Sequence, residues 1–488
     1  MGGKIFFMDL IKNIQSKYRK WERQKAIKIL TTTDPEKIVA YGEKLLIKAF
    51  HRAAQRVPAY KGFLRKKGVV PQKIKDIESF RNYVPFLDKE IVFRNNDMEK
   101  LCVNGTLKNI KSFYSSSGYS GTFSFGLETE KSLRETAKLI DLFLDFQFKV
   151  CDKKTLLVNC LPMGVKIYSN LVKTAEPGVR SDVALALIKK LSKSFDQIII
   201  VGENLLLKQL VEDGLEQGIN WETLTVHLIT GGEFVAENWR SYMAHLLTMD
   251  FDQPENGLIA INMGLSELSL SIFQENPATI NIRRQLLKNQ SFKAALLGTQ
   301  KDNHPIPMVM QYSPINVFLE TQVHSNGMKD LVVTTLGDVQ MPLIRYQTGD
   351  FVGLLSNKKM KEILTQCNLG YLMPSFKFPF ALIYGRFKGM KGEDNQEIFP
   401  EVIKEALFSD FNLACCITGN FKLKVISDHV LIEIQLKKRI ESTTKLEYDF
   451  KKAIATQITS NFEVKLFPYH QFPYGLEVDY ERKFKYID

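Results

Sequence analysis

The sequence lacks several features that mark common classes of protein. No stretch of it approaches about 18 consecutive apolar residues, and the N-terminus lacks the apolar core and small-residue cleavage site of a secretory signal. The six cysteines, at positions 102, 151, 160, 367, 415 and 416, show no Cys-x-x-Cys spacing and no clustering with histidine. We therefore expect a soluble, cytoplasmic protein with reduced thiols, and with neither a zinc site nor a disulfide framework.

Several catalytic signatures are also missing. The chain contains no GxxxxGK[ST], HExxH or GxSxG motif. Its net charge of +12 does not indicate nucleic-acid binding, because the 66 basic residues are interleaved with 54 acidic ones along the whole length. From Lys12 to Lys28, basic residues share a predicted helix with apolar ones such as Ile14 and Trp21. We expect this apolar stripe to pack on its own domain and to make no membrane contact.

Short apolar runs alternate with amphipathic helical patterns along the chain. Hydrophobic residues make up 44% of the 488 positions, enough for two or more domains. Asp34-Pro35 predicts the start of a helix that ends near Arg56. The strands predicted in the middle of the chain are 156–161, 197–201, 226–230 and 258–262, and the helices are 130–148, 181–194 and 204–216. This alternation predicts an α/β fold with a largely parallel sheet.

A serine- and glycine-rich stretch from Ser115 to Thr122 precedes the predicted 130–148 helix. Glycine lets the backbone approach a ligand closely, and successive N–H groups and hydroxyls can converge on phosphate oxygens. A helix that follows such a loop adds its positive dipole. Taken alone, the stretch fits either a phosphate-binding loop or a plain surface turn.

Three later segments carry carboxylates beside glycine. The strand predicted at 226–230 ends at Gly231-Gly232-Glu233, and the strand at 258–262 runs into a predicted turn, Gly264-Leu265-Ser266-Glu267. Ligands bind at the carboxyl ends of strands in such sheets, so both turns are candidate edges of a site. Between 331 and 353 the pattern predicts short strands joined by turns, with Asp350 in a Gly-Asp turn. Each feature is also explained by a tight connection or a helix cap.

A segment rich in glycine and lysine, from Tyr384 to Gly392, is interpreted as a domain boundary. Beyond it, predicted helices at 400–407 and 446–460 alternate with strands near 415–418, 429–436 and 462–467, which indicates a small α+β module. The chain ends in a basic and aromatic cluster that contains Lys483 and Lys485.

The order of these motifs resembles that of the adenylate-forming, or acyl-activating, enzymes. The serine-rich loop is followed by Gly-Gly-Glu, Gly-x-Ser-Glu, Arg-Tyr-x-Thr-Gly-Asp, Gly-Arg and a lysine near the C-terminus. Val57 to Lys61 and Asp88 to Glu90 match the phenylacetate-coenzyme A ligase branch, with its relatives in capsule biosynthesis and in bacterial luminescence. The resemblance covers nearly the whole chain. It implies a large N-terminal multi-sheet α/β domain, residues 1–385, and a small mobile C-terminal α+β domain, residues 386–488, with a hinge at Lys388.

The resemblance also implies a role for each motif. The residues that would wrap the β- and γ-phosphates of ATP are Ser116, Ser117, Gly118, Ser120, Gly121 and Thr122. Those that would border the adenine are Gly231, Gly232 and Glu233, with Gly264 and Ser266 close by. Glu267 would hold Mg²⁺, Asp350 and Arg386 would bind the ribose, and Lys483 would be the catalytic lysine. Lys485 lies close enough in sequence to compete with Lys483 for that role.

The implied reaction forms an acyl-adenylate and pyrophosphate from a carboxylic acid and ATP, and then transfers the acyl group to an acceptor such as coenzyme A. The segments 161–164 and Asn262-Met263 are read as apolar, which favours an aryl or fatty acid. The loop exit, Phe123-Ser124, departs from the family pattern, which predicts the loss of one phosphate-side contact. The segment from Lys388 to Asn395 departs too, so transfer to an amine, or to a protein or carrier nucleophile, without coenzyme A stays open. A non-catalytic membrane-surface binding protein on the same fold is the further alternative.

Overall fold

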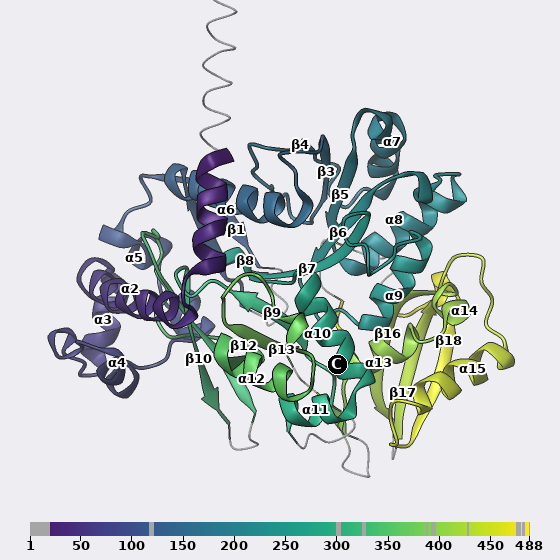
Figure 1. The fold of residues 1–488 in the computed structure, drawn as a ribbon. Helices are drawn as coiled ribbons and strands as arrows, with labels where there is room; N and C mark the ends of the chain where they lie inside the picture. Colours follow the sequence, from purple (N-terminus) through teal and green to yellow (C-terminus); the bar gives the residue numbers. More distant parts are fainter. Residues whose placement is uncertain are drawn as a thin grey trace, which may run out of the picture.

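A mixed sheet of 11 strands forms the centre of the computed structural model, in the order β10-β11-β12-β13-β9-β8-β7-β6-β5-β3-β4 (Figure 1). The structure describes residues 20–116, 122–298, 304–324, 328–386, 389–391, 397–426, 429–474, 480 and 484–487. The strands of this sheet are β3 (Thr155–Cys160), β4 (Lys173–Ala175), β5 (Gln197–Gly202), β6 (Val226–Gly231), β7 (Gly257–Leu265), β8 (Ser269–Gln274), β9 (Met308–Tyr312), β10 (Val317–Val323), β11 (Lys329–Thr335), β12 (Tyr346–Leu355) and β13 (Phe380–Gly385).

Only one half of the sheet is parallel. Strands β4, β3, β5, β6 and β7 pair in parallel, as the alternation of strands and helices predicts. From β7 to β10 every pairing is antiparallel. The prediction of a largely parallel sheet is therefore wrong for this half. The physical reason is that β7 and β8 are joined by a short turn at 266–268, and a connection this short can only join antiparallel strands.

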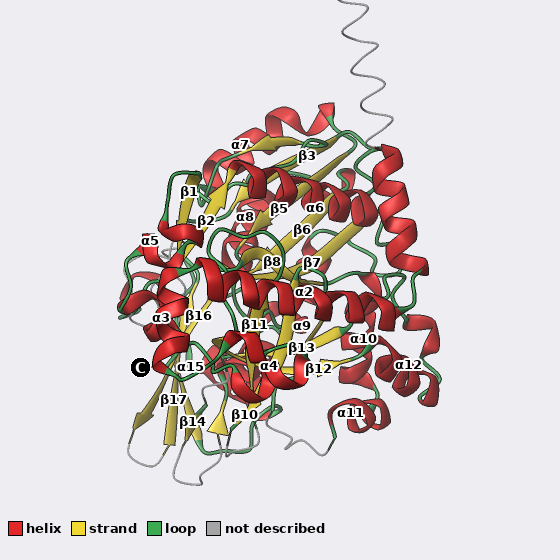
Figure 2. Cartoon of the chain, turned by 90° about the vertical axis from the view of Figure 1, so that its left-hand side faces the viewer, coloured by secondary structure: helices red, strands yellow, loops and turns green. Residues whose placement is uncertain are grey.

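Helices cover both faces of the parallel half of the sheet, and Figure 2 shows them on the two sides of the strands. Apolar residues of α7, α8 and α9 pack on one face, and those of α6 and α10 pack on the other. Helices α6 and α8 begin and end where the sequence predicts. The helices with named bounds are α2 (Pro35–Arg56), α3 (Pro58–Lys66), α4 (Ile77–Tyr83), α5 (Met98–Leu101), α6 (Glu130–Phe148), α7 (Ser181–Leu191), α8 (Asn204–Glu216), α9 (Glu237–Leu246), α10 (Pro277–Lys288), α11 (Gln290–Leu297), α12 (Asn357–Gln366), α13 (Pro400–Leu407), α14 (Phe411–Ala414) and α15 (Thr444–Ala455).

The N-terminal helices α2 to α5 enclose a second apolar cluster beside β12. The Asp34 side chain caps α2 as predicted, because it accepts a hydrogen bond from the backbone N–H of Glu36 at 2.8 Å. Residues 20–32 form a helix, and its Arg23 pairs with Asp145 at 3.3 Å. Trp21, predicted to pack within the domain, is 54% exposed, which corrects that part of the prediction. The preceding part of the predicted basic helix lies outside the described residues.

The serine-rich loop connects two strands, β1 (Ile110–Ser115) and β2 (Phe125–Thr129), which form an antiparallel hairpin. Strand β2 lies between the loop and α6, so the predicted helix follows the loop but does not begin at its end. The hairpin packs closely on the turn between β7 and β8. A Cβ atom added to Gly126 would overlap the carbonyl oxygen of Ser266, so only glycine permits this approach.

Two predicted turns lie inside strands. Gly264 belongs to β7, which continues three residues beyond the predicted strand end at Asn262. Gly349 and Asp350 lie within β12, so the predicted turn there is wrong. Gly349 has a φ of 78°, a left-handed value that glycine adopts without strain, and the pairing of β12 with β11 is irregular next to it. The strand therefore bends at Asp350 without reversing.

The C-terminal residues form a separate small sheet, as predicted. Strands β16 (Ile417–Ile426), β17 (His429–Leu436) and β18 (Phe462–Phe467) carry α13, α14 and α15 and are drawn in yellow and green in Figure 1. A short pair, β14 (Met390–Lys391) and β15 (Glu397–Ile398), precedes them. One apolar cluster runs from the large sheet into α13 and β16, so the two sheets share a continuous core.

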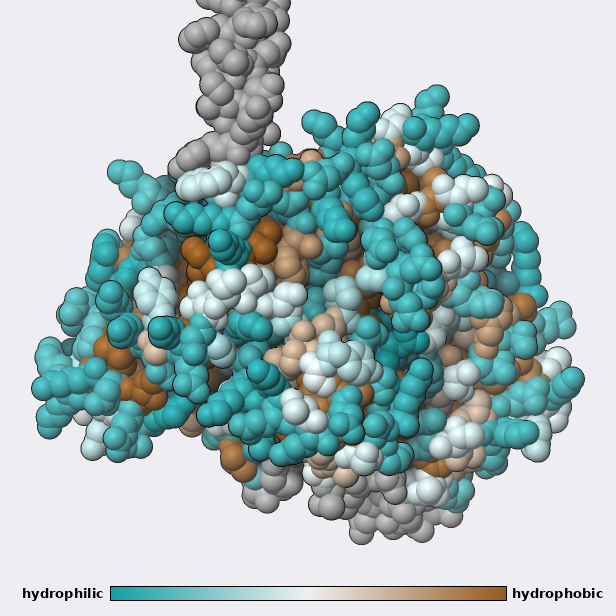
Figure 3. All heavy atoms as spheres, viewed as in Figure 1, coloured by the Kyte–Doolittle hydropathy of each residue, from teal (hydrophilic) through white to brown (hydrophobic). Residues whose placement is uncertain are grey.

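Among the described residues, no helix is long and apolar enough to cross a membrane. On the face drawn in Figure 3, hydrophilic side chains predominate and hydrophobic ones are scattered among them.

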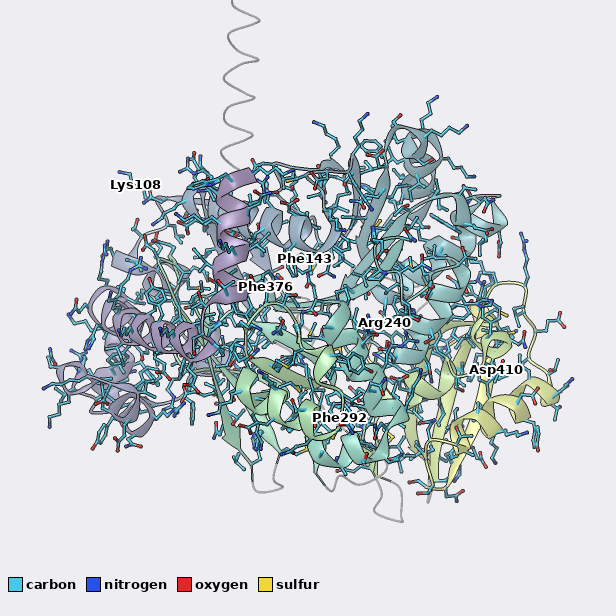
Figure 4. The ribbon with its side chains drawn as sticks, viewed as in Figure 1. Lys108, Phe143, Arg240, Phe292, Phe376 and Asp410 are labelled. Atoms are coloured by element: carbon cyan, nitrogen blue, oxygen red, sulfur yellow. The ribbon has the colours of Figure 1, made fainter. Side chains whose placement is uncertain are left out.

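A buried guanidinium holds α9 against the sheet. Arg240, labelled in Figure 4, is fully buried, and its Nη2 lies 2.9 Å from both carboxylate oxygens of Glu275. Its Nε donates to Glu237 at 3.1 Å, and its Nη1 donates to the carbonyl of Ile259 in β7. Glu237 also pairs with Arg283 at 3.5 Å, so the removal of Arg240 affects Glu275 most, because this buried carboxylate then loses the guanidinium that pairs with it.

We predict that Arg240→Leu lowers the free energy of unfolding by roughly 3–5 kcal/mol, because Glu275 is left buried and unpaired. The measurement is denaturant unfolding of the whole chain. Arg180→Ala, which removes an exposed ion pair with Asp182, is the matched control and is expected to leave the unfolding curve unchanged. A double variant, Arg240→Leu with Glu275→Leu, should recover part of the loss, and no recovery would contradict the explanation.

Candidate active site

The Glu267 carboxylate is held by hydroxyl groups from three segments of the chain. Its Oε2 accepts hydrogen bonds from the hydroxyls of Ser124 at 2.9 Å and Ser266 at 3.0 Å. Its Oε1 accepts from the Tyr346 hydroxyl at 2.9 Å. Burial, and then the negative charge of Glu267, raise the pKa of Tyr346, so the phenol stays protonated and donates. The carboxylate is thereby fixed in orientation next to the base of the serine-rich loop.

The two ends of the serine-rich loop are tied together. The backbone N–H of Ser116 donates to the carbonyl of Ser124, and the N–H of Ser124 donates to the Ser116 hydroxyl, both at 2.9 Å. Lys89 brings a cation to the same point, with its Nζ donating to the Ser116 hydroxyl at 3.4 Å. The predicted phosphate-binding residues Ser117, Gly118, Ser120 and Gly121 lie outside the described residues. The two described amides thus close the base of the loop, while hydroxyl groups and an ammonium group lie beside it.

Sequence reasoning missed the roles of Lys89 and Tyr346. Backbone hydrogen bonds place both, because Leu87 donates to the Arg345 carbonyl at 2.9 Å and accepts from the Gln347 N–H at 2.8 Å. The signal was present in the sequence, since Lys89 lies in the Asp88-Lys89-Glu90 match and Tyr346 lies in the Arg-Tyr-x-Thr-Gly-Asp motif.

The exit of the loop is held by a second carboxylate. The Thr122 hydroxyl donates to Glu90, which also pairs with Arg94 at 2.7 Å. The hydrogen bond from Thr122, followed by that from Arg94, holds the pKa of Glu90 below its usual value. Thr122, predicted to bind phosphate, is thus occupied by a neighbouring side chain in this structure.

Asp350 and Arg386 come together as their predicted common role requires. The Arg386 Nε lies 3.7 Å from Asp350 Oδ1. Asp350 lies within β12, and Arg386 directly follows β13. Asp350 is buried in β12, whereas the Arg386 side chain is 43% exposed at the end of β13. The pair offers a buried acceptor beside an accessible donor, and its ribose-binding role stays a prediction.

Glu233 contacts the C-terminal module. Gly231 ends β6, Gly232 has a φ of 93°, and the Glu233 carboxylate follows this glycine turn. One carboxylate oxygen lies 3.1 Å from Lys404 Nζ, and the other accepts from the Tyr486 hydroxyl at 3.1 Å. The turn predicted to border adenine therefore also fastens the C-terminal residues to the large sheet, a contact that sequence reasoning missed.

Two predicted functional residues, Lys483 and Lys388, lie outside the described residues. The neighbouring Lys485 is described, and its carbonyl accepts a hydrogen bond from Lys422 Nζ at 2.9 Å. Within the described ranges, no group of three or more His, Cys, Asp or Glu side chains could hold a metal ion. A single carboxylate, Glu267, fits Mg²⁺, which is usually held by one or two carboxylates together with substrate phosphates and water.

Glu401 is a titratable group near the Glu233 contact that no motif indicated. Its Oε2 is enclosed and accepts no hydrogen bond from the described residues. Burial raises the pKa of Glu401 to about 7, against the opposing effect of the Lys404 charge and with a further rise from Glu233. A Cβ atom added to Gly385 would lie 3.4 Å from Glu401 Oε1, so the carboxyl also faces the end of β13.

The raised pKa of Glu401 predicts a pH-dependent stability. Because the folded pKa of about 7 exceeds the usual 4.5, the folded chain binds the extra proton between these values, and the free energy of unfolding falls as pH rises through this window. Relative to Glu401→Gln, the wild type should lose up to roughly 1.4 kcal/mol per pH unit between about pH 5 and 7. Thermal unfolding of both proteins across this range is the measurement. The exposed Glu441→Gln should follow the wild type, and parallel profiles for wild type and Glu401→Gln would contradict the prediction.

No protein-family model matches the chain, and no curated protein matches it. Solved structures match over most of its length. For 2-hydroxyisobutyryl-CoA ligase in the postadenylation state with R3-HIB-AMP, the TM-score is 0.66 at 13% identity, covering 94% of this chain and 90% of that one. For the same ligase in the postadenylation state with 2-HIB-AMP, the TM-score is 0.65 at 14% identity, covering 92% of this chain and 88% of that one. For that ligase with 2-HIB-AMP and CoA in the thioesterification state, the TM-score is 0.54 at 14% identity, covering 94% of this chain and 90% of that one. This likeness confirms the predicted adenylate-forming fold, while the phenylacetate-coenzyme A ligase branch stays a prediction.

Proposed function

We propose that this protein activates a carboxylic acid with ATP as an acyl-adenylate and then transfers the acyl group to an acceptor. The observation that carries the proposal is the gathering around Glu267 of the serine-loop base, Lys89 and Tyr346. These groups come from four separate parts of the chain, and together they supply the hydroxyls, the cation and the carboxylate that a nucleotide triphosphate site needs. The adenylate-forming fold supports the same conclusion.

In the first step, a carboxylate oxygen of the acid attacks the α-phosphorus of ATP, and the bond from that phosphorus to the bridging oxygen breaks, so that pyrophosphate leaves. Two anions must approach each other, so the site has to offset their repulsion. Lys89 at the loop base would hold the departing phosphates. Mg²⁺ bound by Glu267 would neutralise phosphate charge. Lys483 would stabilise the charge on the acid and the α-phosphate.

In the second step, the acceptor attacks the acyl carbonyl carbon, loses its proton, and AMP leaves. Coenzyme A is the proposed acceptor, and 2-hydroxyisobutyryl-CoA ligase of like fold binds CoA. The likeness to that ligase is greater in its postadenylation state than in its thioesterification state, with TM-scores of 0.66 and 0.54. We therefore assign the described arrangement to the first step. Transfer to an amine or to a protein nucleophile is the alternative for the acceptor.

We further propose that residues 386–488 rotate about Lys388 between the two steps. In the described arrangement, Glu233 binds Lys404 and Tyr486, so that rotation has to break these contacts. The acid is proposed to be aryl or fatty, which follows from the apolar residues near the loop after β3.

ATP–pyrophosphate exchange across aryl, fatty and amino acids tests the proposed first step. We predict exchange with at least one acid, and a loss of at least about 100-fold in Glu267→Gln, because the carboxylate that would hold the metal becomes neutral. Glu441→Gln, an exposed change of the same type, should keep full exchange. Absence of exchange with every acid would overturn the proposal.

The lysine assignment has its own test. Lys483→Ala should abolish exchange, because the charge that stabilises the reacting α-phosphate is lost, and it should still allow supplied acyl-adenylate to react with the acceptor. Lys485→Ala makes the same change in charge two positions away and should retain exchange. The reverse result would assign the catalytic role to Lys485.

A further inference from the structure

On one face of the parallel half of the sheet, the side chains of β6 and β7 are apolar in the core, and the row on β7 becomes polar at the carboxyl end of the strand. Ile229 of β6 and Ala260 of β7 belong to the cluster between the sheet and α6. Side chains two positions apart on a strand point to the same face, so Asn262 is the next residue in the row of Ala260, and it is paired in register with Gly231. A Cβ atom added to Gly231 would overlap the carbonyl oxygen of Asn262, so glycine permits the close approach of the two strands at this point. The apolar core row of β7 therefore ends in a primary amide.

The amide of Asn262 has an unmet hydrogen-bonding requirement. Its Oδ1 is enclosed and has no hydrogen-bond partner among the residues that the structure describes. Buried polar atoms are paired in the great majority of cases, so an exception requires a physical reason. Asn262 lies at the carboxyl edge of the parallel strands, where ligands bind in open α/β sheets. A ligand group is therefore a natural partner for this oxygen.

The segment after β3 supplies an apolar wall on the same face. It is fixed by polar contacts, because the Asn159 amide donates to the carbonyl of Val165 at 2.7 Å, and Asp141 accepts from the Ser169 hydroxyl at 2.6 Å. Three of its side chains pack against the cluster that contains Ile229 and Ala260, namely Leu161, Ile167 and Leu171. This face thus combines packed apolar side chains with one amide oxygen at its edge.

We propose that the acid activated by this protein is apolar apart from a hydroxyl or amino group, which donates a hydrogen bond to Asn262 Oδ1. This inference rests on the proposed acyl-activating function and narrows its substrate to hydroxy- or amino-substituted aryl or aliphatic acids. It changes the reading of Asn262-Met263 as part of an apolar lining. A pocket that hydrogen-bonds a substrate hydroxyl or amine discriminates strongly against the analogue without it, because its own polar group is then left unpaired.

The test compares matched acids in ATP–pyrophosphate exchange. Benzoic and phenylacetic acids and a fatty acid are each paired with their hydroxy and amino derivatives, and kcat/KM is measured for every pair. The wild type should prefer at least one substituted acid to its parent by at least about tenfold. Asn262→Leu, which keeps the branching at Cγ and removes the acceptor, should reduce that ratio at least about tenfold and leave the parent acid equal or improved.

Thr230→Val is the matched control. Thr230 lies on the neighbouring strand and its enclosed hydroxyl also lacks a partner among the described residues, but its side chain points to the opposite face. This variant should leave the ratio between substituted and parent acids unchanged. A wild type without preference, or an Asn262→Leu variant with an unchanged ratio, would overturn the inference. An equal loss for all acids, together with weaker ATP binding, would assign Asn262 to the nucleotide and would also overturn it.

Failure of the proposed function gives a different result. If no acid supports exchange, acid binding is measured directly by calorimetry with the same matched pairs on wild type and Asn262→Leu. If a substituted acid binds preferentially to the wild type and this preference is lost in Asn262→Leu, the inference about the acid-binding site is supported, and only the proposed activity is overturned. Absence of preferential binding would overturn the inference as well.

Discussion

The buried guanidinium of Arg345 is the constraint on which the arrangement of groups around Glu267 depends. It pairs with Glu320 at 3.2 Å and donates to the carbonyls of Arg81, at 2.8 Å, and Val84. A buried charge is stable only when it is paired and fully hydrogen-bonded, so these contacts fix the segment after α4 against β12. Arg345 itself has a φ of 49°, an uncommon value that this set of contacts maintains. Lys89 and Tyr346 reach the site from the two segments that Arg345 joins.

A second set of buried polar contacts determines how the C-terminal module sits on the large sheet. The Glu405 carboxylate accepts from the backbone N–H groups of Glu237 and Asn238 at 2.7 and 2.9 Å, and so caps α9 from outside its own segment. Lys208 donates to the carbonyl of Ile417 at 2.7 Å in a similar way. Any rotation of the module would expose these groups to water, and water can replace a hydrogen bond to a cap or a carbonyl. These polar contacts suit an interface that opens, and a rotation would also have to separate the apolar cluster that continues from the large sheet into α13 and β16.

The sequence predicted local structure well where one segment decides it, and poorly where distant segments decide it. Helices α6 and α8 follow from their own periodicity, and Asp34 follows from capping chemistry. The strand interior at Asp350 could not be predicted, because a Gly-Asp pair is typical of turns and only pairing with β11 and β13 keeps the chain extended. In the site, the motifs predicted Glu267, Asp350 and Arg386 as functional residues. Glu401 and Lys404 carry no motif, since their significance arises from packing against Glu233.

The exit of the serine-rich loop departs from the family pattern in sequence, and the structure shows the contacts that Ser124 makes there. The sequence predicted a lost phosphate-side contact at Ser124. In the structure, Ser124 is one of the hydroxyls that orient Glu267, and a cation reaches the loop base from Lys89 instead. The attraction between a phosphate and a cation depends on the distance between the two charges and on the medium. A lysine from another part of the sequence can therefore supply the same stabilisation. The local departure at Ser124 is thus compatible with the proposed phosphate site, because the Arg345 contacts fix the segment that carries Lys89.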